Sequence, residues 1–196
     1  MNLPTLDQTI QHLHQWGWQP GTWMNEDWWS HLGLRAWQDA YWQFPACRSR
    51  IDHLILQRHG ITWTSLPGSL GPQQQALFAL EPRLPQLIMA LGIVALNCPD
   101  HLLLKDRRLA LRPHLDDLCC DKLLALHRGW SLTAQALPSE TLRLTALHTG
   151  TRWWLRDIEQ TPLRDLLTLR LPPVIDTPLH VEENAHQWLT KIGRFL

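Results

Sequence analysis

The sequence contains little of what β-strands, charged surfaces and nucleotide sites require. It has three valines against 39 leucines, and leucine suits helices whereas β-branched residues favour strands. Charged residues make up 18% of the chain, and 18 basic residues balance 18 acidic ones. This balance argues against a nucleic-acid partner and against a polybasic membrane binder. We therefore predict a mainly α-helical protein with no nucleic-acid partner.

The motifs of common enzyme classes are missing as well. The sequence has no G-x-S-x-G elbow for a serine nucleophile, no G-x-x-x-x-G-K-[ST] loop for phosphates and no G-x-G-x-x-G turn for a dinucleotide. The stretch from Gly68 to Gly71 lacks the lysine that a phosphate loop needs. We expect a chain that is not an enzyme, with no catalytic residue and no cofactor.

Targeting and membrane signals are scarce too. No Lys or Arg precedes Arg35, so the positive start of a signal peptide is missing. The longest strongly apolar run, from Leu87 to Leu96, has ten residues, whereas a membrane span needs about 20. The four cysteines indicate mostly buried free thiols in a reducing compartment; they are Cys47, Cys98, Cys119 and Cys120. We expect a cytoplasmic protein with no direct membrane insertion.

Tryptophan, by contrast, is abundant. The chain has 12 tryptophans but one tyrosine and three phenylalanines. Seven tryptophans fall within residues 1–46: Trp16, Trp18, Trp23, Trp28, Trp29, Trp37 and Trp42. We predict a compact multi-helix domain with a Trp-rich N-terminal helical lobe over 1–60, a Gly/Pro/Ser/Gln-rich loop over 61–75 and a helical core over 76–196. The early tryptophans are expected to fill the lobe's core more often than to contact a partner.

Proline, glycine and capping residues divide the chain into further helices. The predicted helices cover about 5–16, 25–42 with a break near Gly33, 48–59, a segment from 85, 99–110, 113–128, 139–160, 162–171 and 179–196. The 113–128 helix has the clearest amphipathic pattern, with Asp116 and Asp117 in its first turn and His127 and Arg128 in its last. Both ends therefore match the helix macrodipole.

The residues that suggest metal chemistry lie on this helix and shortly before it. Two histidines and two cysteines lie on it, and a Cys-x-x-His pair precedes it: His114, Cys119, Cys120, His127, Cys98 and His101. Their spacing does not converge as zinc ligands do, so we expect no metal. An alternative is a metal-dependent hydrolase that uses His114, Asp117, Asp121 and His127, because residues 117 and 121 share a helix face.

A second candidate site is a stretch rich in Arg and Trp. Trp153 and Trp154 are flanked by Arg152 and Arg156. Adjacent residues on a helix do not face the same side, so we expect one of the two indoles near the surface. Trp and Arg dominate the energetics of protein interfaces. We therefore predict that Arg152, Trp153, Trp154 and Arg156 bind a partner.

Three leucine-rich stretches follow one another between residues 83 and 173. They run from Arg83 through Pro85 and Leu87 to Leu91-Gly92, from Leu124 to Gly129, and from Leu166 to Pro173. In order and spacing they resemble the SctK family, cytosolic accessory proteins of the type III secretion sorting platform that include OrgA, MxiK and PscK. The resemblance covers about residues 83–173 and leaves the Trp-rich residues 1–46 outside it.

This resemblance implies a non-enzymatic adaptor of a bacterial injectisome. The expected partners are the SctD-type inner-membrane ring protein, through its forkhead-associated-like cytoplasmic domain, and the SctQ-type pod protein, with the stator and ATPase as indirect partners. The implied location is the bacterial cytoplasm, peripheral to the inner membrane at the secretion apparatus. An unrelated small helical regulator or chaperone remains a further alternative.

Overall fold

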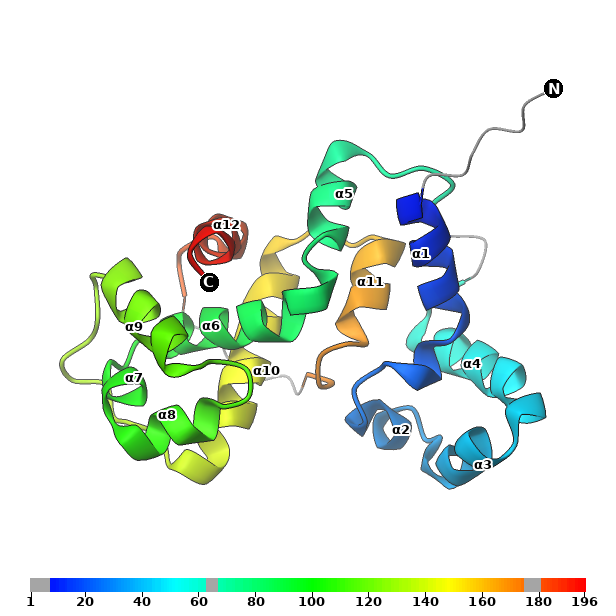
Figure 1. Ribbon diagram of the computed structural model, residues 1–196, viewed down its shortest axis with the longest axis horizontal. Helices are drawn as coiled ribbons and strands as arrows, with labels where there is room; N and C mark the ends of the chain where they lie inside the picture. Colours follow the sequence, from blue (N-terminus) through cyan, green and yellow to red (C-terminus); the bar gives the residue numbers. More distant parts are fainter. Residues whose placement is uncertain (1–7, 63–66, 175–180) are drawn as a thin grey trace. The chain divides into compact units, whose positions relative to one another are not determined.

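The computed structural model describes residues 8–62, 67–174 and 181–196, and all regular structure in these ranges is helical (Figure 1). The predicted mainly α-helical fold is therefore confirmed. The chain divides into two compact units. The first comprises Met1–Pro82 and Gln160–Pro173, and the second comprises Arg83–Glu159 and Val174–Leu196. The boundary after Pro82 lies seven residues C-terminal to the end of the predicted loop at 61–75.

The first unit consists of short helices. They are α1 (Gln8–Trp18), η1 (Pro20–Thr22), α2 (Asp27–His31), η2 (Arg35–Trp37), α3 (Gln38–Gln43), α4 (Pro45–His59), α5 (Pro72–Phe78) and α11 (Pro162–Thr168), with η4 (Glu81–Arg83) at the boundary. A proline begins each of α4, α5 and α11, where its missing N–H is not needed. Gly60 ends α4 with a φ of 87°, which glycine adopts without strain.

The segment 25–42 is broken as predicted. Gly33 has a φ of 65° and separates α2 from η2 and α3. α1 continues to Trp18, two residues past the end of the helix predicted over about 5–16.

Tryptophans fill much of the first unit's core. Trp16 stacks on Trp23 with ring centroids 3.8 Å apart, and Trp29 meets Tyr41 edge-on. The indole N–H of the buried Trp28 donates to the Leu171 carbonyl at 2.8 Å. This bond ties the late segment 160–173 to the first 60 residues, a pairing that no local sequence pattern predicts.

The second unit is built around two crossing helices. Its elements are α6 (Leu84–Leu96), α7 (Asp100–Leu103), α8 (Lys105–Leu111), α9 (Asp117–Leu126), α10 (Ser139–Asp157) and α12 (Ala185–Phe195). α10 packs on α6, and α8 and α12 pack beside them (Figure 1). Two glycines allow the crossing: a Cβ on Gly92 would lie 1.8 Å from the Ala146 carbonyl oxygen, and one on Gly150 would lie 2.1 Å from that of Ile88.

Two predicted helices of this unit differ from the structure. The 99–110 helix is split at Leu104, whose ψ of 131° is extended. The 113–128 helix begins only at Asp117, because the Asp116 side chain accepts the Cys119 N–H at 2.7 Å and so acts as its N-cap.

One segment has the length and apolar composition to cross a membrane. It runs from Pro72 to Leu96, with 61% of its most apolar window buried. It contains α5, the turn at Glu81–Arg83 and α6 rather than one continuous helix. Nine residues of α6 are buried within the protein, as expected of a core helix, so length and composition alone are weak grounds for a span.

Candidate interaction site

The structure buries both tryptophans of the predicted partner-binding stretch. Trp153 is 0% exposed and Trp154 is 1% exposed, so the expectation that one indole lies near the surface is wrong. The reason is that α10 is covered on several sides: α6, α8 and α12 all pack against it. The partner-binding role of Arg152, Trp153, Trp154 and Arg156 stays a prediction, and only the two arginines retain accessible surface.

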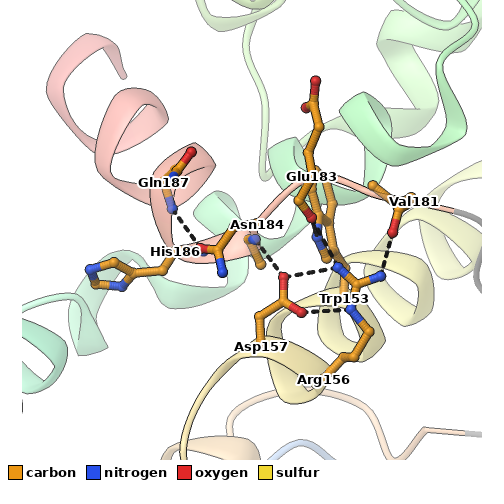
Figure 2. A network of polar contacts seen from close by, with 9 residues as sticks. Trp153, Arg156, Asp157, Val181, Glu183, Asn184, His186 and Gln187 are labelled. Carbon is orange, nitrogen blue, oxygen red and sulfur yellow. Dashed lines mark hydrogen bonds and ion pairs between the residues drawn. The ribbon is translucent and has the colours of Figure 1, made fainter.

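The polar groups at the end of α10 bind a later segment of the same chain (Figure 2). The Trp153 indole N–H donates to the Glu183 carbonyl at 2.8 Å. The Arg156 guanidinium donates to the carbonyls of Val181 and Glu183, the latter at 2.9 Å. These bonds hold residues 181–183 against α10, and they satisfy backbone carbonyls that would otherwise need water.

Arg156 also positions the neighbouring carboxylate. Its Nε and second terminal nitrogen donate to the two Asp157 oxygens at 2.5 and 2.9 Å. This bonding, which outweighs partial burial, holds the pKa of Asp157 below its usual range and raises the pKa of Arg156. Asp157 in turn accepts the Ala185 N–H at 2.7 Å. A charged acceptor thus lies at the N-terminus of α12, where the macrodipole favours it.

The N-terminus of α12 has its own cap as well. The Asn184 side chain accepts the N–H groups of His186 and Gln187 at 3.0 and 3.2 Å (Figure 2). The Trp188 indole donates to the Glu183 carboxylate. We call the contacts of Trp153, Arg156 and Asp157 with residues 181–185 the α12 clasp.

The residues of the hydrolase alternative do not form a site. Asp117 accepts from Arg112 at 2.7 Å and Asp121 from Arg108 at 2.5 Å. His127 instead bonds the Asn97 side chain at 3.0 Å, and burial lowers its pKa. Within the ranges that the structure describes, no three His, Cys, Asp or Glu side chains are grouped to hold a metal ion.

Exposed apolar side chains mark surfaces that the sequence did not single out. In the first unit, Trp37, Trp42 and Phe44 are 53%, 49% and 56% exposed; we call them the aromatic set. In the second unit, leucines of α7, α8 and α9 and the residue between α7 and α8 are exposed. These form the leucine set: Leu103, Leu104, Leu109 and Leu118. Single exposed apolar residues are ordinary, but aromatic residues are enriched at protein interfaces relative to the rest of the surface.

The sequence alone does not show which of the seven early tryptophans are exposed. Trp16, Trp28 and Trp29 are buried whereas Trp37 and Trp42 are not. α3 is a single short helix with one buried residue, Tyr41. Such a helix has too few turns for an apolar period to show which face is covered.

Fold and site together define a mainly α-helical protein in which several indole and guanidinium groups bind the protein's own backbone carbonyls. Its family follows from comparison. A family model described as a type III secretion system subunit matches residues 11–173, and the chain therefore belongs to this family of type III secretion system subunits. No curated protein and no solved structure matches it significantly. The match includes most of the Trp-rich segment and ends before α12.

Proposed function

We propose that this chain is a non-enzymatic adaptor of the SctK type in the bacterial cytoplasm. It links the forkhead-associated-like domain of the SctD-type ring protein to the SctQ-type pod of the sorting platform. Membership of a type III secretion family supports the general process. The resemblance of residues 83–173 to SctK proteins supports the more specific role.

The observation that carries this proposal is that each unit exposes its own apolar set. An adaptor needs two separate partner surfaces, and interfaces are built around buried aromatic and aliphatic anchors. The aromatic set belongs to the first unit and the leucine set to the second. If one partner binds the aromatic set and the other binds the leucine set, the exposure of both sets is explained.

The test uses the full chain with the purified ring-protein cytoplasmic domain and pod protein of the same secretion system. One variant combines Trp42→Ser with Phe44→Ser, and the other combines Leu103→Ser with Leu109→Ser. Because anchor residues carry about 2 kcal/mol or more each, we expect each variant to bind one partner at least about 30-fold more weakly and to keep the other. Titration calorimetry measures this, with circular dichroism to verify folding.

Leu132→Ser is the matched control, because Leu132 is 96% exposed and lies on the loop between α9 and α10, away from both sets in sequence. It should bind both partners as the unaltered chain does. The proposal fails if the unaltered chain binds neither partner. Its assignment of surfaces fails if both double variants bind both partners normally.

A further inference from the structure

α12 presents the side-chain pattern of a helix that binds in a groove. Its buried residues are Ala185, Trp188, Leu189 and Ile192, which correspond to positions i, i+3, i+4 and i+7. This is the spacing by which amphipathic helices anchor in the grooves of other proteins. The opposite face, which includes Thr190 and Lys191, is exposed.

The surface beneath α12 is formed by α6, α9 and α10. Trp188 meets the His127 ring edge-on at 5.4 Å, and its own ring is covered on the solvent side by Lys191, 4.9 Å from the ring centroid. The tryptophan is thus the largest anchor of the helix.

Groups outside α12 satisfy both of its ends. Asp157 of α10 accepts the Ala185 N–H at 2.7 Å at the N-terminus. Arg83, which precedes α6, donates to the Gly193 carbonyl at 3.3 Å at the C-terminus. A carboxylate at the N-terminus and a guanidinium at the C-terminus complement the macrodipole of any helix placed there. The surface of α6, α9 and α10 beneath α12, which we call the groove, therefore places a charge suited to the macrodipole at each end of the helix that lies on it.

The family match provides an independent reason to separate α12 from the rest. It ends at residue 173, whereas the groove residues from Arg83 to Asp157 lie inside it. The part of the chain shared with the family thus contains the groove, and the helix that fills it comes from beyond the matched region.

We propose that the face of α6, α9 and α10 between Arg83 and Asp157 is a docking groove for an amphipathic helix of a partner protein, and that α12 occupies it in cis. The partner helix carries apolar residues at i, i+3, i+4 and i+7, with an aromatic residue at i+3. It competes with α12, which has a high effective concentration because it belongs to the same chain as the groove. The groove is distinct from the aromatic and leucine sets, so the proposal goes beyond the adaptor function.

The experiment displaces α12 without altering the groove. Thr190 is exposed, and proline there removes the backbone N–H and clashes with the His186 carbonyl, so Thr190→Pro breaks α12 in its middle. Thr190→Ala is the matched control, because it leaves the helix intact. The probe is a fluorescently labelled peptide of residues 181–196, titrated with each full-length protein and followed by anisotropy.

We expect the Thr190→Pro protein to bind the peptide at least about tenfold more tightly than the unaltered and Thr190→Ala proteins, whose grooves are filled. A peptide carrying Trp188→Ala should lose most of this binding. The proposal is overturned if Thr190→Pro retains the circular dichroism of the other helices but binds no better than the control. It is also overturned if the unaltered chain forms concentration-dependent dimers that exchange α12, since the occupant would then be a second copy.

If Thr190→Pro loses helix beyond α12, hydrogen exchange of the unaltered chain decides the matter. Docking of a separate helix requires α12 to open while α6 and α10 stay folded. Its amides should then exchange at least about tenfold faster than those of α6. Equal exchange rates in α6, α10 and α12 would show that α12 is an inseparable part of the core and would refute the groove.

Discussion

Alanine at Gly150 tests the helix crossing at the centre of the second unit. Gly150 lies in α10 opposite α6, and its added Cβ would approach the Ile88 carbonyl oxygen to 2.1 Å and the Gly92 nitrogen to 2.8 Å. Both are backbone atoms, so neither can rotate away as the end of a side chain can. The substitution must therefore move one helix backbone relative to the other.

The size of the effect follows from two opposing contributions. Ordinary contact begins near 3.4 Å, so the backbones must separate by about 1.3 Å along this line, and a gap of this size forfeits more than about half of each dispersion contact. Overpacking of a filled core costs about 1–3 kcal/mol, more when backbones are involved. Alanine in place of glycine gains about 1 kcal/mol from helix propensity. We expect a net loss of about 2 kcal/mol or more.

Urea unfolding followed by far-ultraviolet circular dichroism measures this loss as a shift of the transition midpoint. Gly193→Ala is the matched control, because Gly193 is also helical and its Cβ would meet nothing within 4 Å. That variant should be as stable as the unaltered chain or gain up to about 1 kcal/mol. If Gly150→Ala and Gly193→Ala are equally stable, the close approach of α6 and α10 is refuted.

Two further substitutions probe the first unit. Burial raises the pKa of Asp52 to about 6, above the 3.8 of the unfolded chain, despite the bonds that it accepts from Gly21 and Tyr41. The Asp52 carboxyl therefore favours folding most below about pH 4 and loses this advantage as the pH rises through 6, so the stability of Asp52→Asn relative to the unaltered chain should grow by up to about 3 kcal/mol between pH 4 and 7 in urea titrations. A stability difference that does not change with pH would contradict the burial of this charged group. Trp28→Phe leaves the buried Leu171 carbonyl without its donor and should cost about 2–4 kcal/mol from the lost bond and volume, whereas no loss on thermal unfolding would show that Trp28 does not tie 160–173 to the first helices.

Helix ends were predictable where the sequence carries its own signal. The Thr161 side chain caps α11 by accepting the Arg164 N–H at 3.2 Å, as its position before Pro162 indicates. Gly60 ends α4 as expected. At Leu104, by contrast, no proline, glycine or capping residue predicts the break between α7 and α8. There the Arg108 Nε donates to the Leu102 carbonyl at the end of α7, a contact that depends on how the chain has already turned.

The candidate site was predictable only in part. The Arg- and Trp-rich stretch at 152–156 was correctly recognised as unusual, but helical spacing does not say how many neighbours surround a helix. α10 is covered by α6, α8 and α12, so both indoles are buried. The segment that receives Trp153 and Arg156 begins 25 residues after Arg156. No local pattern predicts such a pairing.

The abundance of Arg and Trp has a physical explanation in the shortness of the helices. The last four carbonyls of every helix lack an intrahelical donor, and a chain of many short helices has many of them. Arg and Trp side chains only donate hydrogen bonds. Here they reach carbonyls at the C-terminal ends of several helices: Trp23 to Trp16 in α1, Arg58 to Leu32 after α2, Arg48 to Tyr41 in α3, Arg108 to Leu102 in α7, Trp130 to Leu124 in α9 and Arg83 to Gly193 in α12.

This explanation changes how the composition bears on function. A surplus of Arg and Trp suggested partner anchors, because these residues dominate interfaces. Six of them are used to satisfy helix ends within the described chain, and Trp153 and Arg156 bind backbone carbonyls in the α12 clasp. Composition therefore overstates the binding surface. Trp37, Trp42 and Phe44 stay exposed, and they are the aromatic side chains through which we propose that the first unit binds a partner.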